Sequence, residues 1–359
     1  MPNRIYNFNP GPATLPLPAL QTAMNELLDY RNTGMSILET SHRAPEFEQI
    51  LAETQSLFKE LLKIPENYHI VFLGGGASLQ FAMIPMNFIP EGGSADYINT
   101  GTWATKAIEE AEIIAKCNVA ASSKDKNFCY IPRKFNLDPK AAYVHLTSNN
   151  TIKGTQWHNF PDFHGKPVIA DMSSDILSRK FDFSKFAMVY AGAQKNLGPA
   201  GITVIFLKDE FAKTAREGLP TMLAYKTHIE KNSLYNTPAV FAVYIIRLVL
   251  QWMKDQGGLA TIEKINNKKA DLIYGAMDDS GGYYRGTAEK EDRSFMNLTM
   301  RMANEDLEKK FISEAKAQGL HGLKGHRSVG GIRASMYNAF PLEGAEKLAE
   351  FMHNFKKKN

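Results

Sequence analysis

The sequence predicts an α/β protein in which a largely parallel sheet forms a large domain and a smaller α/β domain follows. Short apolar runs that end in polar loops, such as 142–147, 167–171 and 186–191, alternate with stretches of helical periodicity. The length of 359 residues suits two domains, or one large α/β unit with an appendage. Because ligands of such sheets bind outside the carboxyl ends of the strands, functional residues are expected there.

Composition and charge indicate which class of protein the chain belongs to and which partners are excluded. The chain is 44% hydrophobic and 22% charged, which is ordinary for a globular protein. A net charge of +4, from 42 basic and 38 acidic residues, is too balanced to indicate a nucleic-acid partner. Cys117 and Cys129 lack metal-motif spacing and exclude a disulfide framework, which favours a reducing, cytoplasmic compartment. The longest apolar stretch, 239–253, is interrupted by Arg247 and is too short to cross a membrane.

The individual elements follow from periodicity and from turn residues. Asn9–Pro12 is expected to be irregular and rigid, because its two prolines fix φ and remove backbone donors around a glycine. Pro45 suits the first turn of a helix, and Gly257 with Gly258 ends another. The pattern predicts helices over 17–28, 45–63, 79–86, 104–116, 210–218, 239–253, 259–277 and 305–318, and strands over 69–73, 142–147, 167–171, 186–191, 202–207 and 295–301.

Lys195 is the residue around which a function can be argued. It follows the apolar run 186–191 and precedes Gly198 and Pro199, so it lies at the mouth of a buried sheet. A lysine held there loses solvation, which favours the neutral amine and allows a Schiff base with an aldehyde. The alternative is a solvated loop lysine. Other residues must decide between the two.

A second feature is the glycine loop Gly74–Ser78 between the strand 69–73 and a helix. Glycines let the backbone approach an anion, and the helix N-terminus directs unpaired N–H groups at it. The loop predicts a phosphate cradle, although a plain flexible turn has the same composition. Because neither Gly-x-Gly-x-x-Gly nor a Walker lysine is present, neither NAD nor ATP is predicted. Trp103, at a strand-to-helix turn, is either core packing or a flat face for an aromatic ligand.

Thr151, Asp171 and Lys195 all fall at the ends of predicted strands, and this convergence indicates a cofactor. Pyridoxal phosphate needs a lysine for its aldehyde, a cradle for its phosphate and a carboxylate that keeps its ring nitrogen protonated. An aromatic plate suits its ring. Once displaced by a substrate amine, Lys195 is free to move protons.

Eight segments match a known family: Asn7–Ala13, Ser41–Arg43, Gly74–Phe81, Gly101–Trp103, Ala170–Ser174, Gly192–Gly201, Tyr235–Pro238 and Gly330–Ser335. Along these, and over essentially its whole length, the chain resembles the phosphoserine aminotransferases, class V enzymes of the fold type I group, and their bacillus-type sequences most. The resemblance implies a fold type I pyridoxal-phosphate-dependent transferase, with a mainly parallel seven-stranded-type sheet. It also implies a large cofactor domain, 15–257, and a small domain of 1–14 with 258–359.

The resemblance also implies roles for particular residues. Lys195 would carry the cofactor, Asp171 would meet its ring nitrogen, and Trp103 would stack on its ring. The remaining roles would be Thr151 near the phenolic oxygen, Ala77, Ser78 and Gln194 on the cofactor phosphate, Asn236 and Thr237 on the phosphate of the neighbouring subunit in a homodimer, Arg333 on the substrate α-carboxylate, and His42, Arg43, His326 and Arg327 on the distal phosphate or the glutamate side chain. No metal is expected. Unlike some relatives, this glycine loop carries no arginine.

The implied reaction transfers an amino group from L-glutamate to 3-phosphohydroxypyruvate and yields O-phospho-L-serine and 2-oxoglutarate, in serine biosynthesis. Many relatives also accept 3-hydroxy-2-oxo-4-phosphooxybutanoate in pyridoxine biosynthesis. Alternatives are another class V aminotransferase, such as alanine–glyoxylate aminotransferase, and a non-catalytic protein that binds pyridoxal phosphate or a phosphorylated ligand. A cysteine desulfurase is disfavoured, because no cysteine follows position 129.

Overall fold

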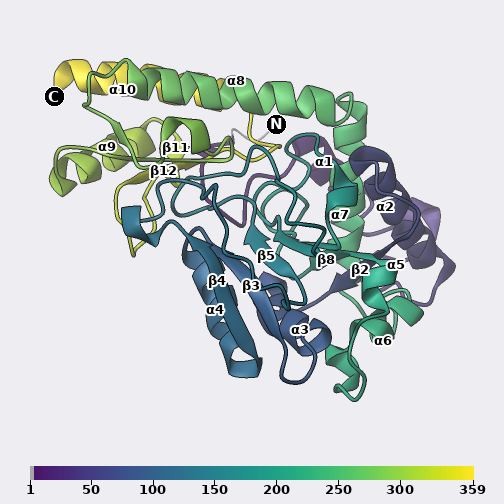
Figure 1. Ribbon diagram of the computed structural model, residues 1–359. Coiled ribbons are helices and arrows are strands. Elements are labelled where there is room, and N and C mark those ends of the chain that lie inside the picture. Colours follow the sequence, from purple (N-terminus) through teal and green to yellow (C-terminus); the bar gives the residue numbers. More distant parts are fainter. Residues whose placement is uncertain (1–3) are drawn as a thin grey trace.

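A seven-stranded sheet forms the centre of the protein, as seen in the computed structural model, which describes residues 4–359 (Figure 1). The strand order is β2-β8-β7-β6-β5-β3-β4, and only β8 runs against its neighbours. The mainly parallel sheet is therefore confirmed. Its strands are β2 (Tyr68–Leu73), β3 (Ser94–Asn99), β4 (Lys116–Ser122), β5 (Val144–Thr147), β6 (Val168–Asp171), β7 (Met188–Gly192) and β8 (Thr203–Lys208).

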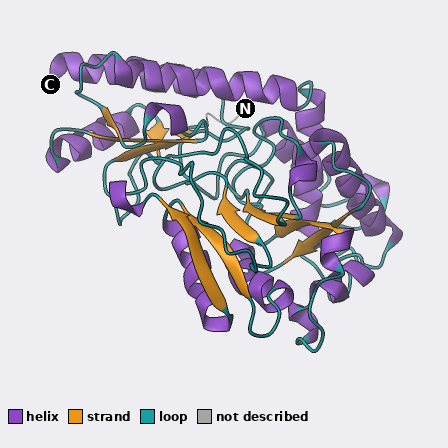
Figure 2. Cartoon of the chain, in the orientation of Figure 1, coloured by secondary structure: helices purple, strands orange, loops and turns teal. Residues whose placement is uncertain are grey.

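Helices cover both faces of this sheet (Figure 2). Successive side chains of β2 point to opposite faces of the sheet, and both faces are apolar. Ile70 and Phe72 pack in one core, whereas Val71 and Leu73 pack in another. The first core is completed mainly by α1, α2 and α7, and the second by α3 to α6. The helices are α1 (Leu17–Asn25), α2 (Pro45–Leu62), α3 (Gly76–Phe88), α4 (Thr102–Ile114), α5 (Asp209–Ala212), α6 (Tyr225–Glu230) and α7 (Val240–Asp255).

A second region follows α7 and has its own sheet and its own core. Its antiparallel sheet has the order β12-β10-β9, and a separate parallel pair joins β1 near the N-terminus to β11. The long helices α8 and α10 run along one side of this region (Figure 1). Its elements are α8 (Leu259–Asp278), β9 (Arg285–Gly286), β10 (Asn297–Arg301), α9 (Glu305–Ala317), β11 (Leu320–His321), β12 (Ile332–Ser335) and α10 (Leu342–Lys358), with β1 at Tyr6–Asn7.

Several predicted boundaries are wrong, for local reasons. The helix expected over 210–218 ends at Ala212, because the chain turns there and the Arg216 backbone N–H donates to Asn87 O at 2.7 Å. The helix expected over 104–116 ends at Ile114, and the edge strand β4 begins two residues later. The strand expected from 295 begins at Asn297, because the Ser294 hydroxyl accepts two backbone N–H groups ahead of it.

Other elements were not predicted at all: β1, β4, α6, β9, β11, β12 and α10. Of β3, only the end from Tyr97 had a strand-like pattern. Short 3₁₀ helices occupy Tyr30–Asn32, Lys124–Lys126, Phe183–Lys185, Thr221–Leu223 and Lys290–Asp292. Within 4–359, no helix combines the length and the apolar character that a membrane crossing requires.

Candidate active site

Lys195 and Thr151 meet at the carboxyl edge of the parallel strands, where the sequence predicted functional residues. Lys195 follows β7 by three residues and Thr151 follows β5 by four. The Lys195 ammonium donates to Thr151 Oγ1 at 2.9 Å. Asp171 is the last residue of the intervening strand β6, is 5% exposed, and accepts the Ser173 backbone N–H at 2.9 Å. Sheet order alone thus brings together an amine, a hydroxyl and a carboxylate at the ends of three adjacent strands.

Burial controls the protonation of this group. It lowers the pKa of Lys195 to about 8; Asp171 opposes the shift and Arg333 adds to it. Burial also raises the pKa of Asp171, while hydrogen bonding from Ser173 and the charge of Lys195 act against this rise. The amine of Lys195 is therefore easier to deprotonate than that of a surface lysine, as the sequence predicted.

Trp103 lies beside this amine, in the first turn of α4. The Lys195 Nζ atom is 6.0 Å from the centroid of its ring, and the Nζ atom of Lys106 is 5.2 Å away. Its buried indole N–H meets no hydrogen-bond partner within the described residues. An aromatic plate with an unused donor therefore borders the lysine, and Lys106, which the sequence reasoning missed, adds a cation.

Arg333 reaches the same spot from the second sheet. It lies on β12 opposite Thr299 of β10, is 5% exposed, and donates through Nη1 to Thr151 O at 3.2 Å. Its buried Nε has no hydrogen-bond partner in the described chain, and no described carboxylate pairs with it. A buried guanidinium with unused donors suits a carboxylate ligand.

The N-terminus of α3 forms an open cradle near this edge of the sheet. The helix begins at Gly76, three residues earlier than predicted, and Gly75 precedes it with φ of 83°. Ala77 and Ser78 therefore lie in the first helical turn, where backbone N–H groups are unpaired. A Cβ atom placed on Gly74 or Gly76 would meet no atom within 4 Å, so there is room for an anion here.

The N-terminal segment packs on the loop that carries Lys195. The Ala13 backbone N–H donates to Gln194 O at 2.9 Å. A Cβ atom on Gly11 would lie 3.4 Å from Lys195 Cγ, and its φ of +135° disfavours any other residue. The predicted irregular segment thus covers the stem of Lys195 and limits its motion.

A second group of predicted site residues lies on an exposed surface. Thr237 Oγ1 and His42 Nδ1 are 3.2 Å apart, and Arg43 and Asn236 adjoin them in sequence. Arg43, Asn236 and Thr237 are exposed. In the part of the chain that is described, no hydrogen bond or ion pair joins this group to Lys195, Thr151 or Arg333. We call these four residues the surface quartet.

His326 and Arg327 occupy the loop that leads into β12. His326 Nδ1 lies 2.7 Å from Ser328 Oγ. Burial lowers the pKa of His326, and the positive charges of Arg333, Arg327 and Lys106 lower it further. Positive charge therefore accumulates between this loop and α4.

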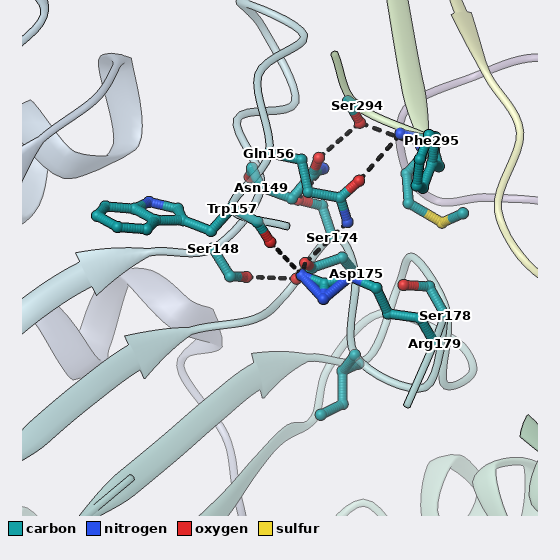
Figure 3. A network of polar contacts seen from close by, with 12 residues as sticks. Ser148, Asn149, Gln156, Trp157, Ser174, Asp175, Ser178, Arg179, Ser294 and Phe295 are labelled. Atoms are coloured by element: carbon teal, nitrogen blue, oxygen red, sulfur yellow. Dashed lines mark hydrogen bonds and ion pairs between the residues drawn. The ribbon is translucent and has the colours of Figure 1, made fainter. Parts of the chain in front are cut away.

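A buried polar network underlies the loop of Thr151, and no pattern in the sequence predicted it (Figure 3). The Asp175 carboxylate accepts hydrogen bonds from Ser148 Oγ and from Gln156 Nε2, the latter at 3.0 Å, and pairs with Arg179 at 3.4 Å. The Gln156 side chain in turn accepts the Phe295 backbone N–H at 3.0 Å. The network joins the loops beneath the site to the segment that leads into β10.

Asn149 extends this network beside Thr151. Its amide donates to Ser174 Oγ at 2.8 Å and to Asn297 Oδ1 at 2.7 Å. Asn297 donates onward to Tyr337 Oη at 3.1 Å, and that hydroxyl donates to Pro10 O at 2.8 Å. Buried polar groups therefore set the position of β10 and β12, and with them Arg333, relative to Lys195.

These groups fit pyridoxal phosphate. An amine with a lowered pKa, a carboxylate on the adjacent strand, an aromatic plate and an open helix N-terminus supply the four contacts that this cofactor needs. The fold and the site together define a pyridoxal-phosphate-dependent transferase. The family model for "Aminotransferase class-V" matches residues 5–348, and the chain belongs to this family.

Within that family the chain is similar to phosphoserine aminotransferases. One from Desulfosudis oleivorans is 55% identical over 100% of both chains. The solved structure of the enzyme from Bacillus circulans subsp. alkalophilus shares 52% identity and a TM-score of 0.97 over 99% of both chains. A pyridoxal-phosphate-bound phosphoserine aminotransferase from Trichomonas vaginalis is 36% identical, with a TM-score of 0.93, over 98% of this chain and 100% of that one.

Proposed function

We propose that this chain transfers an amino group from L-glutamate to 3-phosphohydroxypyruvate and yields O-phospho-L-serine and 2-oxoglutarate in a ping-pong cycle. The names of its relatives support this reaction, which places the chain in serine biosynthesis. The observation that carries the proposal is the convergence on Thr151, whose hydroxyl accepts from the Lys195 amine while its carbonyl accepts from Arg333. An amino acid held by its carboxylate on Arg333 has its Cα beside the lysine.

The cofactor is held by residues from several loops. Bound here, pyridoxal phosphate supplies an aldehyde that carries the amino group and a ring that accepts electrons. Ala77, Ser78 and Gln194 hold its phosphate at the N-terminus of α3. Asp171 would keep its ring nitrogen protonated, and Trp103 would pack on its ring. Thr151 would lie near its phenolic oxygen.

Lys195 moves the proton of the reaction. With a pKa of about 8, its amine can take a proton from the substrate Cα and return one at neutral pH. Thr151 Oγ1, at 2.9 Å, orients that amine. Arg333 binds the substrate α-carboxylate with the two-pronged geometry that its unused donors permit.

The distal anion is bound by the remaining cations. His326 and Arg327 come from the same chain as Lys195, and Arg43 brings a further positive charge beside His42. The same group receives the side-chain carboxylate of glutamate and the phosphate of the keto acid in turn. These four residues include two arginines and no acidic residue, so they attract both a carboxylate and a phosphate.

We further infer a homodimer in which the surface quartet reaches the site of the neighbouring subunit. Because His42 contacts Thr237, the four residues must enter the same site together. Large apolar side chains also lie exposed on this subunit, and Tyr235 adjoins Asn236 in sequence, which suggests a buried interface. Those left exposed here include Met24 at 69%, Leu28 at 85%, Leu38 at 61% and Tyr235 at 45%.

Mixing two inactive variants tests the shared site. Lys195→Ala removes the lysine, and Thr237→Ala with Asn236→Ala removes the contribution to the partner. After the two variants are unfolded and refolded together, half of the dimers are hybrids and each contains one intact site. We expect about a quarter of the wild-type activity. Activity no higher than the sum of the separate variants would place both groups in one subunit's site.

The domain division and the location remain proposals. We propose that residues 15–257 form the cofactor domain and that 1–14 with 258–359 form the smaller one. In support, the buried core of the second region consists, among the described residues, of Phe8 and residues between 273 and 355. Two unpaired cysteines are compatible with a reducing cytoplasm. Use of 3-hydroxy-2-oxo-4-phosphooxybutanoate in pyridoxine biosynthesis is a further proposal, which the names of the relatives do not address.

An acceptor assay tests the proposed reaction. With glutamate as donor, we expect turnover with 3-phosphohydroxypyruvate and little with glyoxylate or pyruvate, because a phosphate dianion matches the cation cluster. Preference for glyoxylate would instead indicate an alanine–glyoxylate type of enzyme. A protein that takes up pyridoxal phosphate but turns over no keto acid would be a binding protein only.

A further inference from the structure

A cavity of about 250 Å³ lies beside the active site and has no assigned role. Its wall combines the loop 126–129, residues 152 and 153 after Thr151, strands β10 and β12, and the loop that contains His326. Its lining includes five basic residues and no acidic one. We call it the basic pocket, and its basic residues are Lys126, Lys153, Arg301, His326 and Arg333.

Only part of this positive charge is neutralised. Lys126 pairs with Glu289 at 3.4 Å, and Arg301 pairs with Glu308 at 2.7 Å. Among the described residues, no carboxylate pairs with Lys153 or Arg333. The Lys153 ammonium donates to the neutral Asn127 Oδ1 at 2.7 Å, and it lies 5.5 Å from the Phe128 ring.

The unpaired cations are also poorly solvated. Lys153 is half-buried, and burial lowers its pKa. Arg333 is 5% exposed and its Nε lacks a partner in the described chain. Like charges held together in a partly buried cavity repel one another until an anion enters. The two unpaired cations therefore favour a negatively charged ligand in this pocket.

We propose that the basic pocket binds a phosphate group, with Lys153 as its principal ligand. The flexible ammonium of Lys153 supplies a point charge, and the planar guanidinium groups of Arg301 and Arg333 match phosphate oxygens. The phosphate belongs either to a phosphorylated keto acid or to free inorganic phosphate. The proposal that this pocket binds phosphate depends on the charges described above. Only its use by the keto acid rests on the proposed function.

The pocket shares Arg333 with the active site. On one side Arg333 bonds to Thr151 O, and on the other it lines the pocket. Because Lys153 and Arg333 line the same cavity, a keto acid that places its carboxylate on Arg333 could direct its phosphate toward Lys153. Lys153 would then supply the positive charge that the glycine loop, without an arginine, does not. Free phosphate in the same place would instead draw Arg333 from the substrate.

Titration of the cofactor-loaded protein with inorganic phosphate, followed by calorimetry, tests the proposal. The loaded form is used because the cofactor then fills its own phosphate cradle. Lys153→Gln is expected to raise the Kd for phosphate about tenfold, since one charge-assisted hydrogen bond is lost. The matched control is Lys124→Gln, an exposed lysine on the neighbouring loop, which should leave the Kd unchanged. Lys153→Arg should restore most of the binding, which separates lost charge from misfolding.

Steady-state kinetics of the same variants distinguish the two sources of phosphate. If Lys153→Gln raises the KM for 3-phosphohydroxypyruvate about tenfold and leaves the KM for glutamate unchanged, the pocket holds the substrate phosphate. If neither KM changes while the Kd for phosphate rises, the ligand is free phosphate. Equal phosphate affinity in Lys153→Gln and Lys124→Gln, or no phosphate binding by the wild type, overturns the site. Lack of wild-type turnover alongside Lys153-dependent phosphate binding overturns the proposed function only.

Discussion

Replacement of Lys195 by alanine is expected to lower the transaminase rate by about 10⁴-fold, the upper range for loss of a catalytic acid–base. The variant should also lose the visible absorbance that pyridoxal phosphate gives when it is bonded to a lysine. In the wild type, this yellow absorbance should bleach with glutamate and return with 3-phosphohydroxypyruvate. Both losses are expected because the Lys195 amine would form the bond to the cofactor and move the proton. Its position in the site is given by the 2.9 Å hydrogen bond to Thr151 Oγ1.

The protonation of Lys195 adds a pH signature to this result. The pKa of its free amine is lowered to about 8, and only the neutral amine attacks an aldehyde. The rate at which cofactor-free wild type takes up pyridoxal phosphate should therefore rise about tenfold for each unit by which the pH increases toward 8. Above about pH 8 the rate should level off.

The control for these experiments is Lys116→Ala, an exposed lysine at the start of β4, which should behave as wild type. A Lys195→Ala protein that retained turnover, or a wild type that stayed colourless after reconstitution, would contradict the assignment of the cofactor lysine.

Replacement of Arg333 is expected to have the second largest effect. Arg333→Ala should lower kcat/KM about 10³-fold for both glutamate and 3-phosphohydroxypyruvate, because both present an α-carboxylate to this buried guanidinium. Arg333→Lys keeps the charge but loses the two-pronged geometry, and a loss of about 10²-fold is expected. Steady-state kinetics with each substrate measure both values.

Arg216→Lys is the matched control, since Arg216 is exposed and its side chain makes no hydrogen bond or ion pair with the described residues 4–359. Equal kinetics for Arg333→Lys and Arg216→Lys would show that Arg333 does not bind the carboxylate. A loss confined to the phosphorylated substrate would move Arg333 from the α-carboxylate to the distal phosphate.

Local sequence patterns predicted the central sheet and the residues at its edge. The strands are buried on both faces and therefore form short, nearly continuous apolar runs, which makes 142–147 and 186–191 easy to recognise. Because parallel strands end at one edge, Thr151, Asp171 and Lys195 could be placed together without knowledge of the strand order. The hydrogen bond between Lys195 and Thr151 agrees with that inference.

The remainder depends on contacts that no local pattern encodes. The edge strand β4 is half-exposed and rich in small and polar residues, so it lacks an apolar run. The polar network joins Asp175 and Asn149 to Phe295 and Asn297, more than a hundred positions away in sequence. The contact between His42 and Thr237 also joins distant parts of the sequence. The five basic residues of the pocket likewise come from two separate stretches, 126–153 and 301–333.

The pairing of the two ends of the chain has a consequence for how the enzyme is made. Tyr6 and Asn7 pair with Leu320 and His321, and Tyr337 Oη holds the carbonyl of Pro10. During synthesis the N-terminal segment leaves the ribosome first, but its partners are translated more than three hundred residues later. The N-terminal segment that covers Lys195 therefore cannot pair with β11 until nearly the whole chain has left the ribosome. Catalytic competence is therefore gained at the end of translation, after the central sheet has its full set of strands.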